Sequence, residues 1–381
     1  MRPIESLYLH FPFCNHLCNY CDFYKHKLES YSQVDDFENQ LSAQIKKHKV
    51  LLAENNFKLS SLKTFYLGGG TPSLWGDKGV NYLEKLIESN ELIIDQNCEF
   101  TLEVDPDAWT EKEIDKWISL GVNRFSIGSQ AFTEKHIKIM DRTHSLGDIE
   151  RTLKFMNEKD LNFSVDLMLG LPKSEDRDII SELDKVLKYN PKHLSVYILK
   201  TRSNYPHNSI LPEDSFIREE YLSVSNFLVN KGYEHYEVSN FAKPGFKSQH
   251  NLNYWSYTPV AALGPNGTGL LVFNSQKAIR YSWKGKTIGF ATEIIASESL
   301  LIEKLFLGLR TSSGLNIPRL LSLNEQGLVS LNKLHNNWRE MGFLSQESHV
   351  SHTILSPLGY LMSDSVINDI FNIMPESSKL S

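Results

Sequence analysis

The sequence predicts an α/β protein built on a partial (β/α)6 TIM-like barrel, followed by a small, mostly helical C-terminal domain. Short β-rich runs alternate with amphipathic helical patterns about six times before residue 235, which is typical of repeated βαβ units. Several of these runs are nearly continuous in apolar character, as expected of parallel strands that are covered on both faces. Six strands fall short of the eight of a closed barrel, so we expect a partial one.

The predicted strands are rich in aliphatic, aromatic and β-branched residues. They are Ser6–Phe13, Thr64–Leu67, Glu99–Val104, Arg124–Ile127, Phe163–Leu169 and His193–Leu199. Between them, the capping-box sequence Thr110–Glu113 predicts the start of a helix, which Gly121 ends. Apolar residues at helical spacing predict further helices around Ile149 and over Glu182–Leu187 and Glu219–Leu228.

The pattern changes after Tyr233, and we expect three parts. Residues 1–233 would form the partial barrel, residues 234–290 an aromatic and Gly-rich segment, and residues 291–381 the helical C-terminal domain. In the last part, helices are predicted at Thr292–Leu309, Leu328–Met341 and Leu358–Phe371, a short β segment near Thr353–Leu355, and a frayed tail at Pro375–Ser381.

Composition and charge narrow the class of protein. The chain has 381 residues, of which 41% are hydrophobic and 23% charged, so a sizeable core can form and wholesale disorder is excluded. A net charge of −6 argues against nucleic-acid binding. We see neither an apolar run of the roughly 18–20 residues that cross a bilayer nor a signal-peptide pattern, and therefore expect a soluble cytoplasmic protein.

The four cysteines are unevenly placed. Cys14, Cys18 and Cys21 lie within eight residues, whereas Cys98 stands alone in a β run. A cluster of cysteines in a chain without an export signal indicates metal or redox chemistry. An isolated cysteine beside apolar residues behaves as a small hydrophobic side chain, so we expect Cys98 to be structural.

The spacing Cys-x3-Cys-x2-Cys lets three thiolates wrap one soft metal centre on a single loop. A cubane iron–sulfur cluster has four irons, so three cysteines would leave one iron open for a ligand. The alternative is a structural zinc site of the three-Cys, one-His kind, for which His10, His16 and His26 are all near enough.

A glycine-rich turn, Gly68–Ser73 (GGGTPS), follows the second predicted strand. Glycines at the end of a strand let a ligand approach the backbone and can expose N–H donors. The turn is no phosphate-binding P-loop, because no Gly-Lys-Ser/Thr follows. Its alternative role is an ordinary tight turn between strand and helix.

Polar side chains recur at or near the later strands. Glu103, Gln130, Arg142 and Asp166 all lie there. Because the carboxyl ends of strands in barrel-like sheets converge on one site, we expect these side chains to meet. Each one taken alone could equally be a structural polar group.

These motifs taken in order, with Tyr8 ahead of the triad and GGGTPS, EVDP, RFSIGSQ and DLMLGLP after it, resemble the radical S-adenosylmethionine superfamily. Within it they resemble the oxygen-independent coproporphyrinogen oxidase-like branch. The resemblance implies that Cys14, Cys18 and Cys21 bind a 4Fe-4S cluster. It also implies that S-adenosylmethionine is held by Tyr8, Gly69, Gly70, Thr71, Glu103, Gln130, Arg142 and Asp166. Glu303 and Arg310 also match the branch, and we expect them to make domain contacts.

The branch contains oxidases and heme chaperones. The oxidases carry a fourth cysteine one residue beyond the triad, where this chain has Phe23. The sequence His250–Trp255 (HNLNYW) matches the His-Asn-x-x-Tyr-Trp motif of the chaperones. The resemblance thus implies heme as a further cofactor, with His250 and Tyr254 as candidate axial ligands. A buried, hydrogen-bonded structural role is the alternative for this histidine.

We therefore expect a heme chaperone that binds heme and passes it to acceptor apo-proteins, membrane-associated ones included. The alternative is an oxygen-independent coproporphyrinogen III oxidase that uses the same cluster and S-adenosylmethionine. A third, more remote function is a radical enzyme acting on an unrelated small substrate. The sequence does not decide whether the chain is an enzyme or whether it forms a homodimer.

Overall fold

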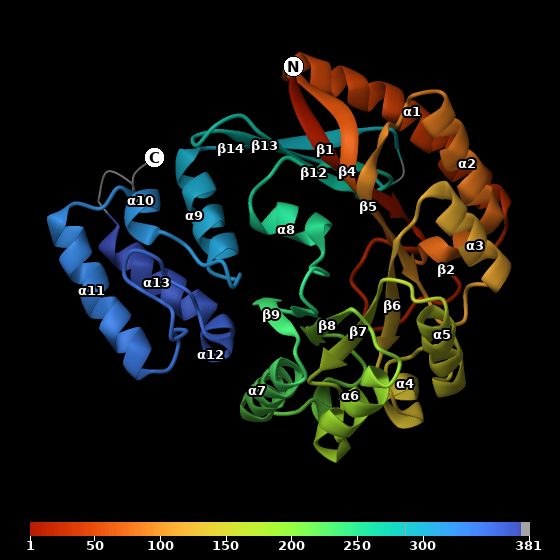
Figure 1. The fold of residues 1–381 in the computed structure, drawn as a ribbon. Coiled ribbons are helices and arrows are strands. Elements are labelled where there is room, and N and C mark those ends of the chain that lie inside the picture. Colours follow the sequence, from red (N-terminus) through yellow and green to blue (C-terminus); the bar gives the residue numbers. More distant parts are fainter. Residues whose placement is uncertain (286, 375–381) are drawn as a thin grey trace.

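The computed structural model describes residues 1–285 and 287–374, and its centre is a nine-stranded sheet (Figure 1). The strand order is β11-β1-β4-β5-β6-β7-β8-β10-β9. Its six central strands are parallel: β1 (Arg2–Phe11), β4 (Phe57–Gly69), β5 (Ile94–Val104), β6 (Arg124–Gln130), β7 (Phe163–Leu169) and β8 (His193–Ile198). Each overlaps one of the six predicted strands, although the predicted Ser6–Phe13 and His193–Leu199 run past the ends of β1 and β8. The predicted α/β fold with a partial barrel is confirmed.

Both edges of this sheet come from the chain after Tyr233. Strand β11 (Ala261–Leu263) pairs in parallel with β1. At the opposite edge, β10 (Asn240–Ala242) runs antiparallel to β8, and β9 (Glu234–Glu237) pairs with β10. Within the described residues β11 and β9 are the two edge strands of the order given above and are not paired with each other, so the sheet is open.

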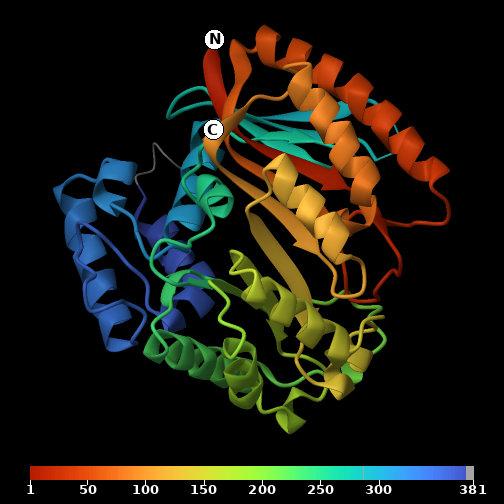
Figure 2. The ribbon, with the colours of Figure 1, turned by 45° about the vertical axis from the view of Figure 1, so that its right-hand side comes forward.

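The helices that alternate with the strands lie in a row along one face of the sheet (Figure 2). They are α1 (Ser32–Glu54), α2 (Gly76–Glu88), α3 (Glu111–Leu120), α4 (Glu134–Ile139), α5 (Leu146–Glu158), α6 (Ile179–Leu187) and α7 (Asp214–Asn230), with short 3-10 turns at Pro72–Trp75, Ser174–Asp176 and Asn208–Ile210. The predicted limits of α3 are confirmed: Thr110 Oγ1 accepts from the Glu113 N–H at 3.3 Å, and Gly121 ends the helix with a φ of 115°.

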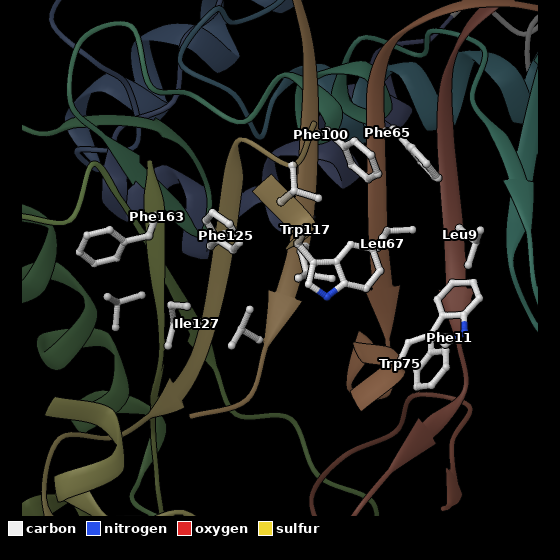
Figure 3. Packing of buried hydrophobic residues seen from close by; sticks show 14 of the residues in the cluster. Leu9, Phe11, Phe65, Leu67, Trp75, Phe100, Trp117, Phe125, Ile127 and Phe163 are labelled. Carbon is white, nitrogen blue, oxygen red and sulfur yellow. The ribbon is translucent and has the colours of Figure 1, made fainter. Parts of the chain in front are cut away.

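The face of the sheet under these helices is apolar. Figure 3 shows its side chains interlocking, with Phe65 and Phe100 on neighbouring strands stacked at 4.4 Å between ring centroids. Trp75 and Trp117, from the covering segments, are almost completely buried against it. This layer is the main hydrophobic core, and its burial stabilises the alternation of strand and helix.

The other face is buried but polar, which the sequence analysis did not predict. Successive residues of a strand point to opposite faces, and the register aligns polar side chains in rows. One row is Ser6, Thr64 and Glu99; the next is Tyr8, Tyr66, Thr101 and Arg124; a third includes Glu103, Ser126, Ser164 and His193. The strands are therefore covered on both faces, as expected, but apolar on only one.

A short helix, α8 (Gln249–Trp255), lies on the polar side, opposite α1, α2 and α3 (Figure 1). Two small sheets accompany it: β2 (Phe13–Cys14) with β3 (His26–Lys27), and β12 (Thr268–Val272), β13 (Ala278–Trp283) and β14 (Phe290–Ile295). The predicted helix at Thr292–Leu309 is wrong at its start, because β14 pairs with β13 and the helix begins only at Ser297.

The C-terminal part is helical, as predicted, and has its own hydrophobic cluster. It consists of α9 (Ser297–Gly308), α10 (Ile317–Leu321), α11 (Glu325–Glu340), α12 (Pro357–Leu361) and α13 (Ser363–Ile373). Bridges from Leu315 to Thr353 and from Leu344 to Leu355 confirm the short β segment. The predicted tail Pro375–Ser381 lies outside the described residues, and the three domain boundaries stay predictions.

Glu303 and Arg310 do contact neighbouring elements. The Glu303 carboxylate accepts two 2.8 Å hydrogen bonds from Arg280 and one of 2.7 Å from the Tyr257 hydroxyl. Arg310 donates to the Asp364 carboxylate at 3.0 Å. Among the residues that the structure describes, no helix is both long and apolar enough to cross a membrane.

Candidate functional site

The three clustered cysteines lie on one loop at the carboxyl end of the parallel strands. Pairing of β2 with β3 closes this loop, and the register sets Cys14 opposite Lys27. Inside the loop, the Cys21 N–H donates to the Cys18 carbonyl at 3.3 Å. All three cysteines line a single cavity of about 330 Å³, hereafter the cofactor cavity.

The donors of this loop suit an iron–sulfur cluster. Of the three candidate zinc ligands, two have other partners: His10 Nε2 lies 2.7 Å from the Tyr24 carbonyl oxygen, and His16 Nε2 lies 3.1 Å from Asp141 Oδ1. The third, His26, lies on β3 opposite Phe13. In residues 1–285 and 287–374, no three His, Cys, Asp or Glu side chains converge on one metal position. A cubane offers separate irons to separate thiolates, which therefore need not converge, and the loop fits such a cluster.

Burial acts on the thiols of this loop. It raises the pKa of Cys14 to about 11, against an opposing hydrogen bond from Thr71, and it also raises the pKa of Cys18. Both thiols therefore stay protonated at neutral pH until a metal ion displaces the proton, as metal coordination does. The isolated Cys98 is buried in the hydrophobic core and lines neither cavity described here, as expected of a structural cysteine.

The glycine-rich turn packs directly against the first cysteine. The N–H groups of Gly70 and Thr71 donate to the carbonyls of Phe11 and Phe13 at 2.7 and 2.8 Å. A Cβ on Gly70 would lie 2.5 Å from the Phe13 carbonyl oxygen and 3.0 Å from Cys14 Sγ. These two N–H groups therefore hold β2, which carries Cys14, in place and are not free to bind a ligand.

Glu103 is the central carboxylate of the cofactor cavity. Its Oε1 accepts from the Tyr66 hydroxyl at 2.9 Å, and its Oε2 accepts from the Gly69 N–H at 3.0 Å. Burial, reinforced by the nearby Asp166, raises the pKa of Glu103 to about 7 despite these two hydrogen bonds. The carboxyl group is therefore poised between its two protonation states at neutral pH.

Asp166 and Gln130 complete the wall formed by later strands. Asp166 accepts from the hydroxyls of Ser126 at 2.8 Å and Ser164 at 3.1 Å, and burial raises its pKa. Gln130 has a φ of 64°, a left-handed conformation that is uncommon for a residue other than glycine. Such strained residues cluster at functional sites, where the surrounding structure holds them.

Arg142 lines the cofactor cavity, and its guanidinium is bound to other groups of the protein. Its guanidinium forms an ion pair with Asp105 and donates to the Gly128 carbonyl at 3.2 Å. His144 Nδ1 lies 3.0 Å from the other oxygen of Asp105. Although burial alone would raise it, Arg142 and His144 lower the pKa of Asp105 to about 2. The carboxylate is thus charged at neutral pH and fixes the orientation of the arginine.

Three predicted residues lie away from this cavity. Tyr8 and Tyr254 line a second cavity of about 460 Å³, between the cysteine loop, α8, the small antiparallel sheet and α9. His250 lines neither cavity; its side chain is buried under the polar face of the sheet. Phe23, which is 69% exposed, lines both cavities and so lies where they adjoin.

The structure also adds residues that the sequence analysis missed. Asp105, Tyr20, Tyr66, Ser126 and Tyr197 all line the cofactor cavity. Strand alternation was the available signal for two of them: Tyr66 stands two positions before Gly68, and Ser126 two positions after Arg124, so each points to the polar face. Tyr20 and Asp105 lie on loops, where no such periodicity exists.

Comparison with known proteins agrees with this geometry. Residues 8–186 match the family model described as the radical SAM superfamily. The chain is similar to the heme chaperone HemW of Escherichia coli, with 32% identity over 73% of both chains, and to that of Lactococcus lactis, with 30% identity over 84% of this chain and 85% of the other. Its fold is similar to that of the solved coproporphyrinogen III oxidase HemN of Escherichia coli, with 18% identity, a TM-score of 0.78, and coverage of 97% of this chain and 90% of the other.

The partial barrel with its three-cysteine loop is therefore that of a radical S-adenosylmethionine protein. Membership of that superfamily implies a 4Fe-4S cluster and S-adenosylmethionine as cofactors. Within the superfamily, the chain belongs to the HemW family.

Proposed function

We propose that the chain is a heme chaperone of the radical S-adenosylmethionine type, which binds heme and transfers it to acceptor proteins. One observation carries the choice between chaperone and oxidase: the cofactor residues line one cavity, but Phe23 stands where the oxidases carry their fourth cysteine. The names of the relatives, which are heme chaperones, support the same choice.

We propose as cofactor ligands those predicted residues that line the cofactor cavity. Cys14, Cys18 and Cys21 would hold the cluster, whose open iron supplies the site for the methionine part of S-adenosylmethionine. The groups proposed to hold the rest of that cofactor are Gly69, Gly70, Thr71, Glu103, Gln130, Arg142 and Asp166. Tyr8 stays a predicted ligand, although it lines the second cavity.

The second cavity is the proposed place for heme. Tyr254, Tyr257, Tyr24 and Phe23 give it aromatic walls, which suit a flat macrocycle. A tyrosine is one of the residue types that ligate heme iron, which supports Tyr254 as the axial ligand. An axial role for His250 stays a prediction; because its ring is buried, α8 would have to move before the imidazole could reach a heme.

The proposed partners are acceptor apo-proteins, among them membrane-associated ones, and the proposed location is cytoplasmic. The names of the relatives support heme and an acceptor. A homodimer stays a prediction from the sequence.

Transfer of heme tests this function directly. The protein is loaded with heme under anaerobic conditions, freed of unbound heme by gel filtration, and mixed with an apo-form of a heme enzyme. We expect the heme to co-elute with the chain and to reach the acceptor faster than the same amount of heme presented on serum albumin. Transfer no faster than from albumin would contradict the chaperone function.

The alternative function is tested in parallel. The protein, with its cluster reconstituted, is incubated anaerobically with coproporphyrinogen III, S-adenosylmethionine and a reductant. We expect the coproporphyrinogen to persist, because the position of the fourth cysteine is occupied by Phe23. Robust formation of protoporphyrinogen IX would favour the oxidase.

A further inference from the structure

The histidine of the chaperone motif faces the inside of the barrel. His250 Nδ1 lies 3.0 Å from Thr64 Oγ1 and 3.4 Å from Ser6 Oγ, which belong to the first polar row of the sheet. Its ring packs against the ring of Tyr66, with 5.1 Å between centroids and 31° between planes. The residue is only 1% exposed, and its ring also lies near the rings of Tyr254 and Tyr8, at 5.4 and 6.4 Å between centroids.

Tyr66 carries this contact into the cofactor cavity. Thr64 and Tyr66 are two positions apart on β4 and therefore point to the same face. The Tyr66 hydroxyl donates to Glu103 Oε1 at 2.9 Å, while Glu103 Oε2 accepts from the Gly69 N–H at 3.0 Å. A continuous chain of contacts thus runs from His250 through Tyr66 to Glu103.

Helix α8 is itself anchored to the polar face. The N–H groups of Gln249 and His250 both donate to the Glu99 carboxylate at 2.9 Å. Asn253, at an unspecified position within the motif, donates from Nδ2 to Ser6 Oγ at 3.1 Å and to Thr64 Oγ1 at 3.3 Å. Two residues of α8, about one turn of the helix apart, therefore contact the same pair of hydroxyls.

The imidazole acts here through shape and hydrogen bonding. Burial and the nearby Arg124 guanidinium lower the pKa of His250 to about 3, so the ring is neutral at physiological pH. A neutral ring can rest against the Tyr66 phenol without placing a second cation beside Arg124.

We propose that His250 is a positioning residue of the cofactor cavity, which holds Tyr66 so that Glu103 is oriented toward S-adenosylmethionine. The inference rests on the proposed function only in taking that cofactor as the ligand of the cavity. It gives the chaperone motif a role in the cofactor site, in addition to any role in binding heme.

The test uses the full chain with its cluster reconstituted under anaerobic conditions. We expect His250→Ala to weaken S-adenosylmethionine binding about 10-fold by calorimetry, as loss of a residue that orients a ligand does at metal sites. The change that S-adenosylmethionine causes in the electron paramagnetic resonance spectrum of the reduced cluster should need correspondingly more cofactor. Iron content should stay as in the wild type.

Three further variants separate positioning from loss of stability. His48→Ala is the matched control, because His48 is equally buried, bonds the Tyr281 hydroxyl at 2.7 Å and lines neither cavity. It should leave S-adenosylmethionine affinity unchanged. His250→Asn, which keeps a polar atom near the position of Nδ1, should restore most of the affinity. Tyr66→Phe, which keeps the ring and loses the hydroxyl, should weaken binding like His250→Ala.

Unchanged affinity in both His250→Ala and Tyr66→Phe would overturn the proposal. So would a His250→Ala variant that loses the Soret band while binding S-adenosylmethionine normally, because the histidine would then serve heme. A wild type without any Soret band would contradict the proposed function alone, since the comparison of S-adenosylmethionine affinities would still stand.

Discussion

At the scale of single residues, the cofactor cavity combines two carboxyl groups of opposite behaviour. Glu103 has a raised pKa because it is buried with few charge partners, whereas Asp105 is held ionised by Arg142 and His144. The surroundings of the two carboxyl groups, and not their residue types, cause the difference between their pKa values. A prediction for each of these residues follows from that difference.

Binding of S-adenosylmethionine should depend on pH through Glu103. The carboxylate form can accept hydrogen bonds from a ribose hydroxyl or an ammonium group, so affinity should rise from pH 6 to pH 8, through the Glu103 pKa of about 7. The titratable and charged side chains that interact with Glu103 are Tyr66, Asp166, Arg124, Tyr8 and Tyr197. The Tyr66 hydrogen bond lowers this pKa, so Tyr66→Phe should move the midpoint to higher pH in calorimetric titrations; an affinity independent of pH would contradict this assignment.

Arg142→Ala should weaken S-adenosylmethionine binding while leaving the cluster in place. Loss of a charge-assisted hydrogen bond costs about 1.5–3 kcal/mol, or about 10–150-fold in affinity. The variant should also unfold at lower temperature, because Asp105 is left buried without its ion-pair partner. Arg151→Ala, which removes an exposed arginine away from both cavities, is the control. Equal binding in the two variants would remove Arg142 from the site.

At the scale of elements, the cysteine loop depends on the turn that follows β4. The Gly70 position leaves no room for a Cβ between the Phe13 carbonyl and Cys14 Sγ. Gly70→Ala should therefore displace β2, which carries Cys14, and lower the iron content of the reconstituted protein. Gly147→Ala, on α5 with its nearest neighbour at 3.6 Å, should not. Full iron content in Gly70→Ala would show that the loop tolerates the shift.

Each cysteine of the loop should be needed for the cluster, whereas Cys98 should not. Removing one thiolate leaves a second iron without a protein ligand. Cys14→Ala, Cys18→Ala and Cys21→Ala should each lose the brown absorbance and most of the iron. Cys98→Ser should keep both, because Cys98 lies in the hydrophobic core. The ligand assignment fails if Cys98→Ser removes the iron and Cys18→Ala retains it.

Local pattern predicted some elements well and others poorly. The six parallel strands and the limits of α3 were predictable, because their signals lie within a few residues of sequence. Strand β14 was not, because its residues are mostly exposed and only pairing with β13 makes them a strand. The place of α8 inside the barrel also depends on distant partners, such as Glu99, that no local pattern reveals.

The same difference between local sequence signals and contacts with distant residues holds for the cofactor site. That Cys14, Cys18 and Cys21 lie together was predictable from their spacing, since one short loop carries all three. Asp105 was not assigned a role, although it pairs with Arg142, because the two lie far apart in sequence. The inward orientation of His250 likewise became evident only from the register of β1 and β4.

At the scale of the whole molecule, two cavities adjoin at Phe23. One contains the cluster loop and the carboxylates, and the other is walled by aromatic side chains next to the chaperone motif. The C-terminal helices form a separate cluster, on the side of α9 in Figure 1. Under the proposed function, this arrangement would let one chain hold its cofactors and a heme side by side.

The most direct test of the central claim is an anaerobic titration of the wild-type chain with heme, followed at the Soret band. If the chain is a heme chaperone, the band should shift from that of free heme and saturate at a fixed ratio of heme to protein. The absorbance of the reconstituted cluster should not change during the titration. A spectrum that stays that of free heme at every ratio would contradict the account.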